Sequence, residues 1–314
     1  MKKQRVFYSA LAVVLLALPY QSQAQSDFGR ALNGPGIYLD TYFSPAKDVN
    51  DPQFESQQGK VGYQLYQLSV DFNLFHSNDP EKNTITHLTN EISFRYHHFN
   101  LEGALATELP ETVYGLDYLV TGTHSFNSRW SMIAVASLGL FSDFEKVTID
   151  DFLISGGLFA VYAINPRLHL GIGPELTYVF GEPLLIPAPY LNWYLGSKIL
   201  LDIQAPSHAI LHYNASEILH FKLAGRFNLG TQYNISLPNS AIDQNLLFSE
   251  GTLGLDTQIE ITNHFSVEVD LAYALYRRLA VSSEGGFSPT VLPQKQFNYS
   301  SGFLPSINLS WNLQ

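Results

Sequence analysis

Charged and histidine side chains recur at alternate positions in several segments of this 314-residue chain. Lys222 and Arg226 stand four residues apart in one segment, and Asp256 and Glu260 stand four apart in the next. Residues an even number apart lie on the same face of a β-strand, so each pair would share a face. Opposite charges across an antiparallel strand pair stabilise the pair by about 0.2–1 kcal/mol.

Two kinds of chemistry suit such a pattern. One is an interior packed with ion pairs, and the other is a polar constriction that selects a solute by its charge. The candidate positions share the polar side of their segments. They are Asp71, Glu91, Arg95, Glu175, Asp202, His212, His220, Lys222, Arg226, Asp256, Glu260, Glu268 and Asp270.

Catalysis has two suggestive groups, which are Ser207 and His208 with His212, and the adjacent pair His97 and His98, whose members would point to opposite faces of a strand. Adjacent residues of a strand point to opposite faces, so we expect Ser207 and His208 not to form a nucleophile–base pair. His208 and His212 share a face, but four strand residues place them about 13 Å apart, too far to bind one metal ion. We therefore expect no catalytic residues, no metal and no cofactor.

The elements that must position these side chains are strands, because apolar and polar residues alternate in segments separated by turn-rich clusters. Short connections alternate with longer ones, as the turns and loops at the two ends of a bacterial barrel do. Joining the two segments around Pro206 would give thirteen strands and place the turn at Asn263 at the wrong end, so fourteen strands are favoured and twelve is the runner-up. The expected strands are 36–43, 61–75, 86–98, 112–125, 128–142, 151–164, 167–180, 184–196, 198–205, 208–214, 217–234, 246–262, 264–280 and 298–313.

The stretch 264–278, HFSVEVDLAYALYRR, shows how the faces divide. Its apolar row runs from Phe265 to Leu275, and the opposite row carries Glu268 and Asp270. Over the last four strands the apolar row, which includes Thr231 and Tyr233, has 25 positions and no charge. A Lys or Arg facing lipid at mid-depth costs about 2–4 kcal/mol, so a charge-free row belongs outside a transmembrane barrel. We therefore predict an all-β, closed, antiparallel up-and-down transmembrane β-barrel with its charges in the lumen.

The N-terminus predicts export. A basic start, the apolar run 11–18 and the small residues 22–24 are typical of a signal peptide cleaved after about Ala24. The expected organisation is a signal peptide at 1–24, a short tail or plug at 25–35 and the barrel at 36–314. Loss of Lys2, Lys3 and Arg5 takes the net charge from −11 to −14, which argues against nucleic acid as a partner. The absence of cysteine excludes a lipoprotein anchor and a disulfide framework.

The export signal, the long alternating strands and the ending Trp311-Asn312-Leu313-Gln314 resemble Gram-negative outer-membrane proteins. More narrowly, the chain is similar to a family of outer-membrane barrels known only as a domain of unknown function in Bacteroidota-type bacteria. That family more distantly resembles the channels for fatty acids and aromatic hydrocarbons. The resemblance implies a location in the cell outer membrane, with outer-membrane lipid and the barrel-assembly machinery as partners.

Three functions follow from this interpretation. The first is passage or binding of a small solute in the lumen. The second is a structural or surface-interaction barrel with an ion-pair-filled lumen, which would act through the loops 44–60, 235–245 and 281–297. The third is a lipid or ester hydrolase at the rim of the barrel. The sequence alone identifies no solute.

Overall fold

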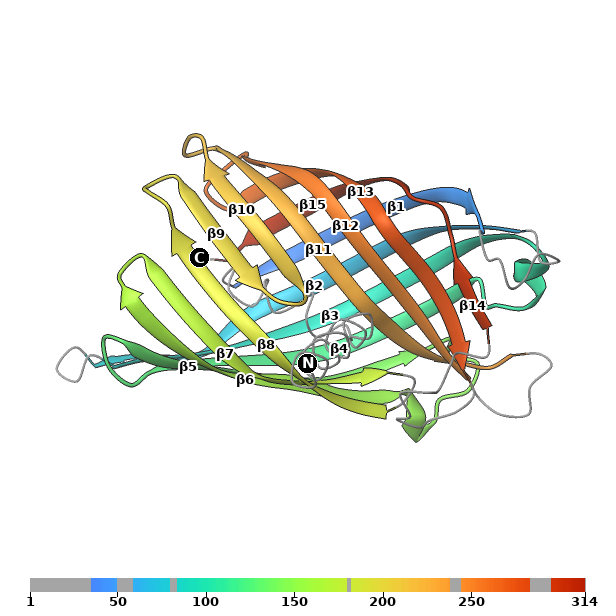
Figure 1. Ribbon diagram of the computed structural model, residues 1–314, viewed down its shortest axis with the longest axis horizontal. Coiled ribbons are helices and arrows are strands. Elements are labelled where there is room, and N and C mark those ends of the chain that lie inside the picture. The colour runs from blue at the N-terminus through green and yellow to red at the C-terminus, as the bar shows by residue number, and fades with distance from the viewer. Residues whose placement is uncertain are drawn as a thin grey trace, which may run out of the picture.

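The computed structural model describes residues 35–49, 59–79, 84–179, 182–237, 244–282 and 295–313 (Figure 1). None of the helices in those ranges is long and apolar enough to cross a membrane. The predicted signal peptide, and all of the predicted tail except Pro35, lie outside the described residues and stay predictions. The elements are β1 (Gly36–Asp48), β2 (Gly59–Asp79), β3 (Thr84–Gly103), η1 (Ala104–Thr107), β4 (Thr112–Ser125), β5 (Trp130–Ser142), η2 (Ile149–Asp151), β6 (Phe152–Asn165), β7 (Leu168–Val179), β8 (Glu182–Tyr194), β9 (Ile199–Gln204), β10 (His208–Asn214), β11 (Leu219–Ile235), β12 (Gln244–Glu260), β13 (Phe265–Ser282), β14 (Lys295–Asn298) and β15 (Gly302–Asn312).

The sheet closes on itself, which confirms the predicted barrel. Each strand from β1 to β13 pairs antiparallel with the next, β13 pairs with β15, and β15 returns to β1. The short β14 pairs with the far end of β13 and continues the line of β15 after a break at 299–301. The wall therefore has the fourteen strands predicted, the last of them interrupted.

The outer surface of the wall is apolar and the inner surface is polar. Leu255 on β12 and Leu271 on β13 are 52% and 55% exposed, whereas their immediate neighbours in sequence, Asp256 and Asp270, are buried. A water-soluble protein has the opposite arrangement, and lipid requires this one. The prediction that Glu268 and Asp270 share the inner face is therefore confirmed for this part of the wall.

The predicted outward positions of Thr231 and Tyr233 are wrong. The pairing of β11 with β12 shifts between Asn228 and Thr231, where β11 carries an extra residue. Such a bulge moves the following side chains to the other face. Thr231 and Tyr233 are consequently buried inside the barrel, and Tyr233 is not part of an aromatic girdle.

The two ends of the barrel differ. We call the end with the connections at 126–129, 195–198 and 261–264 the turn end, and the opposite end the loop end. At the loop end β11 stays paired with β12 as far as Ile235, and Asn234 also pairs in parallel with Ser142 of β5. The Asn234 carbonyl accepts from the Asp143 N–H at 3.3 Å. Segment β11 thus crosses the mouth of the barrel; much of the three predicted loops lies outside the described residues.

Candidate functional site

A cavity of about 420 Å³ occupies the lumen between the strands β1–β3, β9–β13 and β15. Its charged lining comprises five carboxylates and three basic groups, so the wall is acidic on balance. The carboxylates are Asp40, Asp202, Glu250, Glu268 and Asp270, and the bases are Arg95, Lys222 and Arg226. Inward Tyr38 and Tyr42 on β1, together with several amides and hydroxyls, complete a surface that can hydrogen-bond a polar solute.

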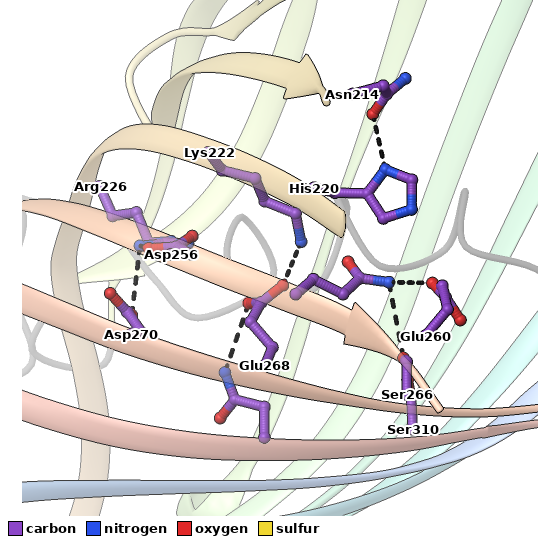
Figure 2. Close-up of polar contacts among 12 residues, drawn as sticks. Asn214, His220, Lys222, Arg226, Asp256, Glu260, Ser266, Glu268, Asp270 and Ser310 are labelled. Atoms are coloured by element: carbon purple, nitrogen blue, oxygen red, sulfur yellow. Dashed lines mark hydrogen bonds and ion pairs between the residues drawn. The ribbon is translucent and has the colours of Figure 1, made fainter. Parts of the chain in front are cut away.

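One wall of the cavity is a network of ion pairs from three neighbouring strands (Figure 2). The Lys222 ammonium on β11 reaches past β12 to pair with Glu268 on β13. Glu268 also accepts a hydrogen bond from the Asn308 amide at 3.5 Å. The network joins β11, β13 and β15, so it fixes this side of the wall and presents alternating charges to the cavity.

Asp256 and Asp270 are direct register partners across β12 and β13. Like charges opposite each other destabilise a strand pair. The Arg226 guanidinium offsets this repulsion, since it pairs with Asp256 and lies 3.5 Å from the Asp270 Oδ2 (Figure 2). The predicted pairing of β11 bases with β12 carboxylates is confirmed for Arg226 and Asp256, and it extends to a third strand that the sequence pattern did not suggest.

The ceiling of the cavity is an aromatic cap, which we define as Tyr63, His97, Phe141, Tyr233 and Phe248. Phe248 packs edge-to-face on Tyr63 and on His97, with ring centroids 5.1 and 5.0 Å apart. Phe141 on β5 meets Tyr233 on β11 at 6.0 Å. The strand β12 is a neighbour of neither β2 nor β3 in the wall, so the contacts of Phe248 span the lumen and close it below the loop end, while Phe141 and Tyr233 meet beside the pairing of β5 with β11.

Two polar groups brace the cap. The Tyr63 hydroxyl donates to the Glu250 carboxylate, with both oxygens at 2.9 Å. Glu250 is the register partner of Arg277 on β13, whose side chain is almost fully buried. The Arg277 guanidinium donates to the Ser44 hydroxyl and to the Ser300 carbonyl, and its carbon lies 4.8 Å from the Tyr299 ring centroid. The cap is therefore tied to β1, β13 and the last strand.

The structure separates the thirteen predicted site residues into three groups. Seven line the cavity: Arg95, Asp202, His212, Lys222, Arg226, Glu268 and Asp270. Asp256 lies behind them, while His220 and Glu260 lie towards the turn end, where His220 contacts Asn214. The remaining three are buried elsewhere in the wall, with Asp71 opposite Glu91 across β2 and β3 and Glu175 on β7.

The expected separation of Ser207 from His208 is wrong. Ser207 lies in the turn between β9 and β10, where strand alternation does not apply, and its hydroxyl is 3.3 Å from His208 Nδ1. His208 Nε2 in turn lies 3.3 Å from Asp202 Oδ2. However, the Ser207 hydroxyl donates its proton to the Gln204 carbonyl at 2.8 Å. A nucleophilic serine must give that proton to its base. In this geometry the Ser207 hydroxyl instead stabilises the turn between β9 and β10.

Several lining residues escaped sequence analysis. Asp40, Tyr38 and Tyr42 lie on the inner face of β1, and Gln67 on β2 accepts a hydrogen bond from Arg95 at 2.9 Å. The sequence signal that could have identified the β1 residues is the alternation that places Tyr38, Asp40 and Tyr42 on one face of the strand. Within the described ranges, no group of three or more His, Asp or Glu side chains is placed to hold a metal ion.

A family model described as a domain of unknown function, DUF6268, matches residues 20–312. The chain belongs to this family. The match confirms the family resemblance, while the bacterial group stays a prediction. No curated protein matches this DUF6268 chain.

Solved structures similar to the DUF6268 barrel are outer-membrane proteins with little sequence in common. The transport unit of the autotransporter AIDA-I from Escherichia coli is 9% identical over 89% of this chain and 90% of its own, with a TM-score of 0.36. The toluene transporter TodX from P. putida is 9% identical over 95% and 94%, with a TM-score of 0.26. The beta domain of the Bordetella autotransporter BrkA is 9% identical over 89% and 100%, with a TM-score of 0.30.

Proposed function

We propose that this barrel lies in the outer membrane, binds a small polar solute in its lumen cavity and passes that solute across the membrane. The observation that supports the proposal most is the 420 Å³ cavity, enclosed by an apolar wall and lined by hydrogen-bonding and charged groups. Cavities that hold small ligands measure about 300–1,000 Å³. The turn end faces the periplasm in this proposal, because bacterial barrels have their short turns there.

Passage requires a change at the aromatic cap. The cap closes the lumen between the cavity and the loop end, so a solute in the cavity reaches the outer surface only if these rings separate. Phe248 contacts Tyr63 and His97 edge to face, and Tyr63 and Phe248 also belong to a larger core of buried side chains at the loop end. Opening therefore requires repacking of that core on solute binding, and the cap is the proposed gate.

Proteoliposome swelling tests this function. Vesicles that contain the wild-type barrel are placed in isotonic solutions of arabinose, glucose or a disaccharide, and the swelling rate reports entry of the sugar. We expect slow swelling with wild type and faster swelling, decreasing with solute size, with Phe248→Ala. Phe303→Ala, which removes a ring from the lipid face, is the matched control.

The outcomes separate the proposal from its main alternative. A folded Phe248→Ala barrel that admits no solute would mean that the lumen does not serve passage, and the surface-interaction interpretation would take its place. Folding is checked by heat-modifiable migration on gels. Location is checked separately, since a protein released from membranes by carbonate without detergent would contradict the membrane assignment.

A further inference from the structure

The barrel wall is incomplete on one side. Twelve of its strands have 11 residues or more, whereas β9 has six and β10 has seven. Six residues span about 20 Å, and with the usual tilt of 35–45° they rise about 15 Å, against an apolar band of about 25 Å. The hairpin of β9 and β10 is thus too short to cross the membrane.

Pairing stops where this hairpin ends. On one side the last bond is from the Ala205 N–H to the Pro189 carbonyl, at 3.0 Å. On the other side it is from the Phe227 N–H to the Ser207 carbonyl, at 2.7 Å. Beyond these bonds β8 has no described partner on this side, and β11 turns away towards β5. Figure 1 shows β8 and β11 diverging there, with β3 and β4 of the far wall visible between them.

The edge of β8 that faces the gap carries prolines at positions where backbone N–H groups would otherwise point into the gap. Since the Pro189 carbonyl faces β9, the odd-numbered residues of β8 direct their backbone groups to this edge. Three of the four odd positions from 183 to 189 are proline, and Leu185 is the exception. Proline has no N–H, so this edge lacks most of the donors that another strand would need. The edge is therefore unsuited to strand addition and tolerates contact with lipid.

The gap lies at the depth of the bilayer, and its β11 side borders the cavity. Trp193 and Tyr194 are exposed at the turn end of β8, where an aromatic girdle belongs. A crossing of about 9–11 residues from Trp193 includes residues 183–189. Next to the gap, Ser207 and Asn228 line the cavity, and so does Phe227, which is 45% exposed. The Phe227 side chain thus borders the cavity and is also exposed on the outer surface.

We propose that the gap between β8 and β11 is a lateral window through which an amphipathic small molecule, whose polar part the cavity binds, moves between the lumen cavity and the membrane. The aromatic cap closes the direct path to the loop end, so the window is the route that the described wall leaves open. Apolar side chains border it, since Leu185 is 66% exposed on one side and Phe227 is exposed on the other. The proposal rests on the proposed function and deepens it, because it adds an apolar part to the polar solute of this cavity and gives that solute a route into the membrane.

Single cysteines in this cysteine-free chain test the window. Asn228→Cys places a thiol in the cavity beside the gap, and Ala272→Cys places one in the cavity on the complete wall of β13. Leu255→Cys faces lipid and is the positive control. Each folded variant in proteoliposomes is treated with pyrene maleimide, which partitions into the bilayer. Because an intact wall excludes lipid, we expect Asn228→Cys to react at least about tenfold faster than Ala272→Cys.

Equal, slow reaction of Asn228→Cys and Ala272→Cys in folded protein would overturn the window. If Asn228→Cys fails to fold, Ser207→Cys at the base of the gap gives the same comparison. The result is independent of the swelling assay. Fast labelling without sugar entry would retain the window and reject passage of polar solutes, while sugar entry with slow labelling would retain passage and reject the window.

Discussion

The Tyr63 hydroxyl lies 2.9 Å from both carboxylate oxygens of Glu250 and donates to them across the lumen. Tyr63 belongs to β2 and Glu250 to β12, and these strands are not neighbours in the wall. The bond therefore holds two distant parts of the barrel together directly at the aromatic cap. Removing this one bond should therefore weaken the cap without disturbing the strand pairing of the wall.

Replacing Tyr63 with phenylalanine should loosen the cap while keeping its ring packing. A hydrogen bond to a charged group contributes about 1.5–3 kcal/mol, so Tyr63→Phe should lower the free energy of unfolding by that order. Urea unfolding in vesicles measures the loss. Tyr66→Phe is the control, because Tyr66 lies on the same strand but is exposed on the outer face. Equal stability of the two variants would contradict a bracing role for the bond.

Arg226 should be essential to the side-by-side placement of Asp256 and Asp270. Arg226→Met removes the compensating charge and should cost about 1–3 kcal/mol, because it leaves the buried Asp256 carboxylate without its partner while Arg226 itself is partly exposed. Adding Asp256→Asn to Arg226→Met removes one of the two opposed carboxylates and should recover part of that loss. Urea unfolding of the two variants checks this, and a double variant no more stable than Arg226→Met would contradict the assignment.

The lipid-facing row should reject charge at mid-depth and accept it at the edge. Leu271→Lys on β13 should lower the free energy of unfolding by about 2–4 kcal/mol, and Leu313→Lys near the turn end by about 0–1 kcal/mol. Both side chains are more than half exposed on the outer face, so only depth distinguishes them. Similar losses for the two variants would place the apolar band elsewhere on the wall.

The acidic balance of the cavity predicts a preference for cations. Five lining carboxylates face three bases, and rings of fixed charge select ions of opposite sign. In barrels opened by Phe248→Ala, the reversal potential under a KCl gradient should have the sign of cation selectivity. Glu268→Gln with Asp270→Asn should shift it towards zero. An anion-selective starting barrel would contradict the charge argument.

Much of the fold follows from period-2 alternation, because in lipid the outer row cannot contain charge and the sheet must close. The apolar, charge-free row from Phe265 to Leu275 is enough to predict that this row faces lipid. The fourteen-strand count follows from the alternation of short turns with longer loops. The same reasoning fails at Thr231 and Tyr233. A bulge in β11 reverses their direction, and no residue type near Asn228 marks it with enough specificity.

The site could be predicted only in part. Inward direction follows from alternation, so Lys222, Arg226, Glu268 and Asp270 were identifiable as lumen candidates. Their pairing could not be derived, because Lys222 passes over β12 to reach Glu268 and register depends on the turns and bulges. Contacts across the lumen, such as Tyr63 with Glu250, depend on the route of β11 over the mouth, which local sequence does not specify.

Single-channel recording in planar bilayers is the most direct test of a lumen that passes solutes through a gated cap. We expect the wild-type barrel to show rare openings, Phe248→Ala to show frequent and larger ones, and Phe303→Ala on the lipid face to match wild type. That result would support the cavity as a conduit with the aromatic cap as its gate. A folded Phe248→Ala barrel that opens no more often than wild type would contradict the account.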